Sequence, residues 1–397
     1  MVLLKKRSVR RRRNRRRPIQ LSAYQLGHIA GFKQGKEDGF QQGRSDASRV
    51  RNSTNIIEAP LPLQLDVLVI TAGIIPSLEI GIVQPFNELH NRGNFNYEIR
   101  TEEDVSQEHV AAAHTIVFLR NVEPASYTYL ELAHQLGKRT VYVIDDNFLE
   151  LEPHTPVGEY YADPSRRETL IQFLRNSQIV KVDSQILGDY IQERFSRDVI
   201  YFPGSVDFNW LDQYPKNETD GQIVIGYEGG NKEADFAKVV PALRRILDYY
   251  GGFVRLEFYG FVPAALANHP MVTFEECGMD YRSFIRKLCE CNWDIGLAPL
   301  ERHSFNNNKT NNKFREYGAC RIAGIYSDSP VYRPWVTHGE TGYLVPHTED
   351  GWYEGLRTMI ENPPMRHQII DRADSMVRQN FSLDVCVEHW NSAILSK

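Results

Sequence analysis

Short, continuous apolar runs alternate with helix-length stretches from residue 65 onward. Continuous apolar runs are typical of parallel strands buried on both faces, and the stretches between them repeat apolar residues at helical spacing. In the first half, the pattern predicts strands at 65–71, 97–100, 115–119, 140–144, 179–182 and 199–202, and helices at 78–92, 125–136, 166–175 and 185–194. This alternation predicts a doubly wound α/β domain over residues 64–206.

A second series of the same kind follows a linker at residues 207–221, which looks irregular from residue 210. It predicts strands at 222–227, 254–259, 272–274 and 295–299, and helices at 235–250, 281–291, 351–360, 365–377 and 383–395. The predicted fold class is therefore α/β with two Rossmann-like domains, the second spanning residues 222–380. Residues 381–397 are predicted to form a C-terminal helix.

Charge divides the chain at a different place. The formal net charge is −5, but residues 1–51 hold 15 Lys and Arg against three acidic residues, a balance of +12 that leaves −17 for the rest. Residues 5–17 contain ten Lys or Arg, a density that favours disorder in the free chain. The segment predicts contact with a polyanion, such as nucleic acid, anionic lipid or an acidic envelope polymer, or else a solubilising tail. No zinc-finger, RNP or helix-turn-helix pattern accompanies it.

Between this basic segment and the first domain, glycine recurs every four residues from Gly27 to Gly43. On a helix these glycines would form a bare stripe suited to self-association, although each costs about 1 kcal/mol relative to Ala. A flexible spacer is the alternative interpretation. Residues 1–63 are therefore predicted to be a basic arm and spacer.

Several classes of protein are excluded by the sequence. No apolar run reaches the roughly 18–20 residues that span a bilayer, and no signal peptide is apparent. The five cysteines are scattered and odd in number, which indicates free thiols in a reducing compartment and no zinc site. We therefore expect a cytoplasmic protein without a transmembrane segment.

Ligands of parallel α/β sheets gather where the strands end at their carboxyl sides. In the first domain those positions are 71–73, 120–121, 145–147 and 183–184. Asp145 and Asp146 place two carboxylates directly after a buried run. They predict hydrogen bonding or proton transfer at an acceptor sugar, a divalent metal site, or a strand-end turn in which an Asp caps backbone amides.

The turn after the first strand of the second domain carries Gly229, Gly230, Asn231 and Lys232. Two glycines allow a backbone to approach a phosphate closely, and a following helix N-terminus and the lysine would add positive charge. A plain tight turn is the alternative interpretation.

A cluster of amides and cations follows the strand at 295–299. Lys309, Lys313 and Glu316 are spaced i, i+4 and i+7, which places them on one face of a predicted helix. Lysines suit a diphosphate and a glutamate suits the vicinal hydroxyls of ribose. The alternative is a charged, solvent-facing helix with amide caps.

Four stretches in this half, 293–300, 313–319, 327–332 and 336–345, resemble the C-terminal half of GT-B glycosyltransferases of the retaining, sugar-nucleotide-dependent group (glycosyltransferase family 1/4-like). The resemblance covers roughly residues 64–397 and is looser in the first half. It implies two Rossmann-like domains that face a cleft, with a final helix that crosses back onto the first domain. The whole chain also resembles glycosyltransferase-like proteins of spore-envelope maturation, which implies a place peripheral to a membrane or spore envelope.

The resemblance also implies roles for particular residues. Glu316 resembles the second glutamate of the family's E-x7-E motif, which holds ribose, while Asn308 stands where the first glutamate is expected. Lys313 and the loop at 229–232 resemble the elements that bind the donor diphosphate, and Lys309 is expected beside them. The implied donor is a nucleotide-diphosphate sugar, and no metal or other cofactor is expected.

The implied acceptor is a glycan, protein or envelope component that enters near Gly73, Asp145 and Asp146. Lys313, Asp145 and Asp146 are the candidate catalytic residues. In a retaining reaction the leaving diphosphate itself takes the acceptor proton, whereas an inverting reaction would use Asp145, Asp146 or His114 as the base. Two other functions stay open: a non-catalytic binding or scaffold protein with this fold, and a glycosyltransferase directed to nucleic acid by the basic arm.

Overall fold

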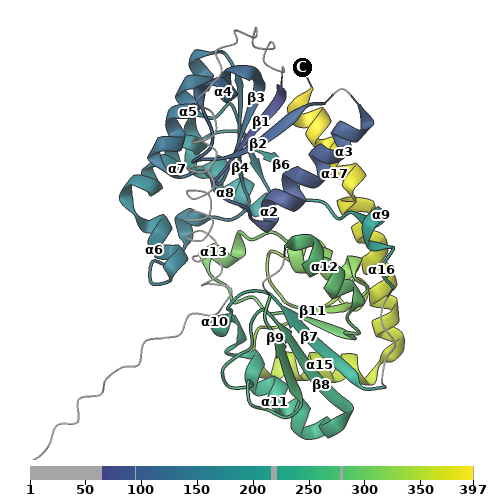
Figure 1. Ribbon diagram of the computed structural model, residues 1–397. Helices are drawn as coiled ribbons and strands as arrows, with labels where there is room; N and C mark the ends of the chain where they lie inside the picture. The colour runs from purple at the N-terminus through teal and green to yellow at the C-terminus, as the bar shows by residue number, and fades with distance from the viewer. Residues whose placement is uncertain (1–64, 94, 216–220, 278–279, 397) are drawn as a thin grey trace, which may run out of the picture.

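The computed structural model describes residues 65–93, 95–215, 221–277 and 280–396, which form two lobes, each built on a six-stranded sheet (Figure 1). The basic arm at 5–17 and the repeat from Gly27 to Gly43 lie outside the described residues. Every strand pair within the two sheets is parallel. The predicted α/β class with two doubly wound sheets is therefore confirmed.

The first sheet runs in the order β2-β1-β3-β4-β5-β6. Its strands are β1 (Leu65–Thr71), β2 (Tyr97–Thr101), β3 (Ala113–Leu119), β4 (Arg139–Ile144), β5 (Ile179–Val182) and β6 (Ile200–Tyr201). All six predicted strands are confirmed within two residues. Alternate residues of β1 enter different cores, since Leu68 and Ile70 pack on one face of the sheet and Val67 and Val69 on the other. Burial on both faces explains why the run is apolar at every position.

The helices of this lobe are α2 (Pro76–Leu78), α3 (Gln84–Arg92), α4 (Gln107–Ala112), α5 (Pro124–Gln135), α6 (Pro156–Ala162), α7 (Pro164–Asn176) and α8 (Gln185–Phe195). A π-helical stretch, Glu79–Val83, joins α2 to α3. Two of its carbonyl groups accept bonds from distant residues: Ile80 from Ser205 at 3.0 Å and Gly81 from the Trp390 indole at 2.9 Å. The sequence did not predict α4 and α6, because segments of six or seven residues are too short to show helical periodicity.

The second sheet runs in the order β12-β11-β10-β7-β8-β9. Its strands are β7 (Ile223–Glu228), β8 (Val254–Tyr259), β9 (Val272–Glu275), β10 (Ile295–Ala298), β11 (Ala323–Ser327) and β12 (Tyr343–Val345). The four strands that periodicity predicted are confirmed within a residue. The other two, β11 and β12, extend the sheet beyond that prediction.

The remaining helices are α9 (Phe208–Leu211), α10 (Glu233–Phe236), α11 (Val239–Tyr250), α12 (Tyr281–Glu290), α13 (Ser304–Asn307), α14 (Asn312–Ala319), α15 (Glu349–Glu361), α16 (Pro363–Phe381) and α17 (Leu383–His389). The single helix predicted at 235–250 is wrong, since the structure divides it into α10 and α11. Pro241 explains the division, because it has no N–H to bond the Ala237 carbonyl that a continuous helix would present. The linker, predicted to be irregular, contains the short helix α9.

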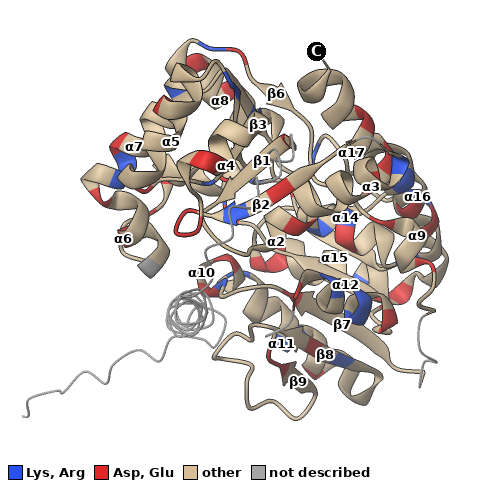
Figure 2. Ribbon diagram, turned by 45° about the horizontal axis from the view of Figure 1, so that its top comes forward, with Lys and Arg blue, Asp and Glu red and all other residues tan. Residues whose placement is uncertain are grey.

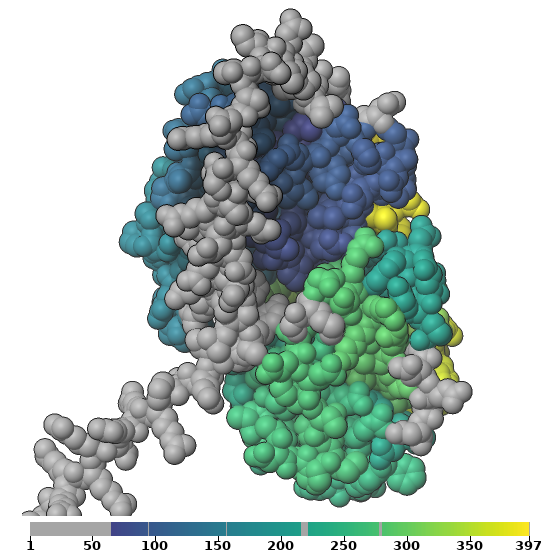
Figure 3. All heavy atoms as spheres, in the orientation of Figure 1, coloured from purple at the N-terminus to yellow at the C-terminus, as the bar shows by residue number. Residues whose placement is uncertain are grey.

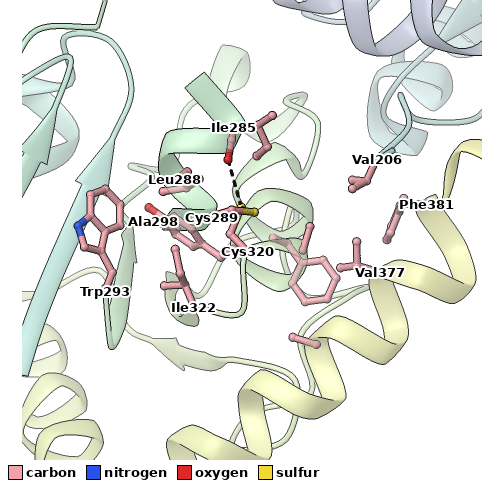
Figure 4. Close-up of a cluster of buried hydrophobic side chains, with 14 of the residues drawn as sticks. Val206, Ile285, Leu288, Cys289, Trp293, Ala298, Cys320, Ile322, Val377 and Phe381 are labelled. Carbon is pink, nitrogen blue, oxygen red and sulfur yellow. Dashed lines mark hydrogen bonds between the residues drawn. The ribbon is translucent and has the colours of Figure 1, made fainter. Parts of the chain in front are cut away.

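A glycine in β7 shows how closely the second lobe is packed. A Cβ atom at Gly226 would lie 1.8 Å from the ring of Trp293. Trp293 belongs to a buried cluster with Leu288 and Cys289 of α12 and with Cys320 (Figure 4). The absence of a side chain at Gly226 is therefore what lets the indole lie flat against the strand.

The chain crosses between the lobes twice, and the two crossings are bonded to each other. The amide of Val206 donates to the Phe381 carbonyl at 2.8 Å, and the amide of Leu383 donates to the Val206 carbonyl at 3.0 Å. Beyond this point the chain lies on the first lobe, where Trp390 is fully buried against Phe86. The yellow C-terminal segment runs along the right side from the lower lobe to the upper one in Figure 1, and some of its atoms are visible at that side in Figure 3.

Basic and acidic residues are interspersed over the outer helices, as α7 and α16 show in Figure 2. In the described part of the chain, no helix has both the length and the apolar character that crossing a bilayer requires.

Candidate functional site

Each sheet has one point where the strand order reverses, between β1 and β3 in the first and between β7 and β10 in the second. Crevices at such switch points, outside the carboxyl ends of the strands, are where open α/β sheets bind ligands. The loop with Gly73 follows β1, and the loop from Gly229 to Lys232 follows β7. Both predicted loops therefore lie at switch points.

An ion pair connects the two carboxyl edges. Nζ of Lys309, in the second lobe, lies 3.5 Å from Oδ1 of Asp146, which follows β4 in the first. Each of these side chains keeps 22% of its surface exposed. The predicted donor side and the predicted acceptor side thus meet at Lys309 and Asp146.

The prediction that Lys309 shares a helix face with Lys313 and Glu316 is wrong. Helix α14 begins at Asn312, so Lys309 lies in the turn between α13 and α14. The segment is rich in asparagine, whose side chain competes with the backbone and favours turns and caps over helix interiors. This turn is what allows Lys309 to extend toward the first lobe while Lys313 and Glu316 face β7.

Asp145 is held by Arg120 and Ser77. The Arg120 guanidinium donates to both carboxylate oxygens, and the Ser77 hydroxyl donates to one of them. Burial alone would raise the pKa of Asp145, but the Arg120 charge and these hydrogen bonds outweigh it and hold the pKa below its usual value. A carboxylate bound in this way is a poor proton acceptor and a good anchor for the arginine.

Arg120 itself has an uncommon backbone conformation. It directly follows β3 at the switch point and has a φ of +56°, in the left-handed region that non-glycine residues rarely adopt. Its guanidinium lies 5.1 Å from the centre of the Phe148 ring. Non-glycine residues in this region cluster at functional sites, so Arg120 joins the candidate residues.

The glycine turn after β7 is required by geometry. Gly229 has a φ of +133°, and a Cβ atom there would lie 3.0 Å from the Tyr227 hydroxyl and 3.4 Å from Nζ of Lys313. Lys313 therefore sits directly against the turn, where it donates to both the side chain and the backbone carbonyl of Glu228. The helix that follows, α10, has only four residues, so the helix-dipole contribution expected at this turn is small.

Lys232 is paired with Asp235 at 2.9 Å. The buried Asp235 carboxylate also accepts from the Glu301 amide at 2.8 Å and from the Asn306 side chain at 2.9 Å. These bonds connect the glycine turn to the segment from Glu301 to Asn306, which includes most of α13. Asn231 is exposed, and its side-chain oxygen caps the amide of Glu233 at 3.1 Å.

Glu316 is 8% exposed and lies near the carboxyl group of Glu228. Burial, followed by the charge of Glu228, raises the pKa of Glu316 to about 8, against the opposing charges of Lys313 and Arg315. Glu316 therefore carries a proton at neutral pH. A protonated carboxyl group can both donate a hydrogen bond to a ligand hydroxyl and accept one.

Two buried amide side chains near Lys309 keep a polar atom that no described residue satisfies. They are Asn308, through its Oδ1 atom, and Asn311, through its Nδ2 atom, and they are 6% and 4% exposed. Buried polar atoms without a partner are uncommon and point to an unseen water or ligand. The Nδ2 atom of Asn308 donates to the Ser304 carbonyl at 2.7 Å.

His114 does not belong to the site. It is exposed at the start of β3, the opposite end of the sheet from Asp145 and Asp146, so its proposed role as a base is wrong. Conversely, Glu228 and Asp235 were not predicted as site residues, because their importance comes from distant partners: Lys313 for Glu228, and Glu301 and Asn306 for Asp235. Arg120 could be found by its place after a buried strand. Within the described residues, no group of three or more His, Cys, Asp or Glu is arranged to hold a metal ion.

Two parallel sheets whose carboxyl edges face each other define the GT-B fold, and the chain has this fold. A crystal structure of Anabaena Alr3699/HepE in complex with UDP and glucose matches with a TM-score of 0.61 at 13% identity, over 83% of this chain and 99% of that one. A glycosyltransferase from Rickettsia africae gives 0.61 at 13% identity, over 84% and 98%. A putative UDP-N-acetylglucosamine 2-epimerase from Listeria monocytogenes gives 0.54 at 9% identity, over 83% and 96%.

At these identities the likeness establishes the fold alone. No protein-family model matches the sequence, and no curated protein matches it either.

Proposed function

We propose that the protein is a glycosyltransferase that uses a nucleotide-diphosphate sugar as its donor. The observation that carries this proposal is the juxtaposition of Lys313 and the Gly229 turn, with the buried Glu316 on the same helix, at the switch point of the second sheet. The fold is one that Alr3699/HepE, described in complex with UDP and glucose, also has. This likeness in fold supports a nucleotide sugar as the ligand of this protein.

The donor diphosphate would bind against the Gly229–Gly230 backbone and Lys313, with Lys232 and Lys309 as further cations. Glu316 would hold the ribose hydroxyls. Asn308 and Asn311 would use their unsatisfied atoms on the sugar or on water bound to it. Stabilisation of the leaving diphosphate by fixed lysines and backbone amides, without a metal ion, is part of the proposal.

The acceptor, a glycan, protein or envelope component, would enter from the first lobe near Gly73 and Asp146. Asp145 is bonded on both oxygens and Asp146 is paired with Lys309, which argues against either as a general base. We therefore favour a retaining reaction in which the leaving diphosphate takes the proton of the acceptor hydroxyl. Asp145 then acts by positioning Arg120.

A second candidate is a non-catalytic binding protein with this fold. The pairing of Lys232, Lys309 and Lys313 with carboxylates and the asparagine at position 308 favour it, because a donor must displace those carboxylates before it can bind. A peripheral location at a membrane or spore envelope, polyanion contact through residues 5–17 and self-association through Gly27–Gly43 remain predictions from the sequence.

The test is a screen of UDP-, GDP-, dTDP- and CMP-linked sugars for release of the nucleotide, with identification of the sugar product by NMR, because epimers have the same mass. A glycosyltransferase is expected to release the nucleotide slowly to water and faster with its acceptor, whereas an epimerase would yield the epimeric sugar. Tight binding without turnover for every donor would favour the binding protein. The proposal would be contradicted if no donor showed either binding or turnover.

A further inference from the structure

Glu228 forms an ion pair with Lys313, the cation that the proposed donor needs. Its carboxylate, with a side chain only 5% exposed, accepts from Nζ of Lys313 while the backbone carbonyl of the same residue accepts from the same ammonium group. The ammonium lies beside the Gly229 turn. A carboxylate therefore stands where an anionic ligand would stand, at a lysine that contacts the turn.

The carboxyl group of Glu228 also meets that of Glu316. Glu316 carries a proton at neutral pH, because burial and the charge of Glu228 raise its pKa to about 8, while Glu228 is the carboxylate paired with Lys313. Together the two groups hold one proton and one negative charge. Lys313 balances that charge. The remaining nearby cation, Arg315, is directed elsewhere, since it donates to the Gly204 carbonyl and to the Asn312 side chain.

The other titratable groups around the pair are tyrosines. They come from α12, from α14 and from the loop after β11: Tyr281, Tyr317 and Tyr332. Burial raises the pKa of each above its ordinary value, so all three are neutral near pH 7. The charges next to the pair are therefore those of Lys313 and Arg315, while Lys232 and Asp235 at the turn form an ion pair with each other.

We propose that Glu228 is the resident counter-ion of the diphosphate site, that the donor displaces it from Lys313, and that the Glu228–Glu316 pair takes up a proton from solvent in that step. This inference rests on the proposed function. The pair holds one proton before the donor binds and two afterwards. No covalent bond changes, and the proton balances the negative charge that Lys313 no longer compensates.

The physical reason is the cost of the alternative. If Lys313 moved to the diphosphate and the pair kept its negative charge, a buried carboxylate would stand unpaired beside two phosphates. Unpaired buried charges are strongly disfavoured, and carboxyl groups in such surroundings bind protons instead. Donor affinity should consequently weaken as the pH rises.

Calorimetric titration at about pH 7 in two buffers of different ionisation enthalpy tests the proposal. The probes are UDP-glucose, GDP-mannose and dTDP-glucose, because a diphosphate esterified at both ends does not itself titrate near neutral pH. The dependence of the measured enthalpy on the buffer gives the number of protons taken up. We expect a value approaching about one per donor, and an affinity that falls by up to about tenfold per pH unit.

Variants assign the proton. Glu228→Gln keeps the shape and an oxygen for Lys313 but has no charge, so proton uptake should vanish and binding above neutral pH should strengthen. Glu316→Gln should retain the uptake, because Glu228 is still displaced. Glu233→Gln, an exposed carboxyl in the same region, is the matched control and should behave as the wild type.

The outcomes separate this inference from the function on which it rests. Binding of a probe with no proton uptake, or with uptake that survives Glu228→Gln, overturns the inference and leaves the proposed function standing. If no probe binds to the wild type or to Glu228→Gln, the proposed function and the inference both fail. Because the wild-type measurement needs no substitution, a variant that fails to fold does not remove the test.

Discussion

Replacing Arg120 by methionine tests whether Asp145 is an anchored carboxylate or a free catalytic base. Methionine matches the arginine stem in length but carries no charge. In the structure it would remove the ion pair and both hydrogen bonds to Asp145. Among the described residues, Ser77 would remain as the only side-chain donor to that carboxylate. Asp145→Asn and the double variant complete a mutant cycle.

The expected magnitude follows from burial. The Asp145 side chain is 7% exposed and that of Arg120 19%, so the pair behaves as a buried one. Removing one partner of such a pair costs about 3–5 kcal/mol, because the other charge is left uncompensated. The double variant leaves no stranded charge and should lose less than the two single losses combined, by at least about 2 kcal/mol.

Urea denaturation near neutral pH, with hydrogen exchange of the β3 and β4 amides as a reading specific to the first lobe, measures these losses. Arg175→Met, an exposed arginine at the end of α7, is the control and should change stability by less than about 0.5 kcal/mol. Single losses below about 1 kcal/mol that simply add would refute the reasoning. They would return Asp145 to the candidate bases.

The pH dependence of the same cycle has a definite sign. The pKa of Asp145 is lowered in the folded protein, so its contribution to stability is present above the pKa of the unfolded carboxyl, about 3.9. It is lost as the pH falls through the lower folded pKa. The advantage of the wild type over the double variant should therefore persist to about pH 4 and decline only below it.

Three further predictions concern the second lobe. Burial raises the pKa of Glu316 to about 8, so the protonated form favours folding, and stability should fall between about pH 5 and pH 8 in the wild type and less steeply in Glu316→Gln, as urea denaturation across that range would show. Gly229→Ala places a side chain at a φ of +133°, which should cost about 1–3 kcal/mol and weaken donor binding in calorimetry at least tenfold; unchanged binding would mean that the backbone turn does not approach the ligand. Gly226→Ala would bring a Cβ atom to 1.8 Å from Trp293, so we expect a loss of at least about 3 kcal/mol in the unfolding free energy or no soluble protein, whereas a stable, soluble variant would contradict the packing described.

Both sheets could be predicted from sequence for a physical reason. Strands such as β1 and β7 are buried on both faces, so their residues are apolar at almost every position, and that signal is local. The end of each apolar run also marks the end of a strand, so the sequence predicts that the loops with Gly73, Asp145 and Gly229 flank a site. The boundaries of short helices such as α6 depend on tertiary packing and leave no such pattern.

The electrostatics of the site could not be predicted, because they depend on pairs far apart in sequence. Lys313 meets Glu228 across 85 residues, and Asp145 meets Arg120 across 25. Spacing alone placed Lys309 on a helix with Lys313, whereas the asparagine-rich turn directs it to Asp146. Residue types therefore indicated the ligand chemistry, while the state of each charge required the fold.

Calorimetric titration of the nucleotide sugars into the wild type and Lys313→Ala tests the central claim most directly. Lys138→Ala is the control, because this half-buried lysine lies just before β4 at the far end of the first sheet, where it donates to the Ala111 carbonyl. The account predicts that at least one donor binds the wild type and the control alike, and binds Lys313→Ala at least about tenfold more weakly, as expected for loss of a charge-assisted contact of about 1.5–3 kcal/mol. Equal affinity for wild type and Lys313→Ala, or no binding of any donor, would contradict it.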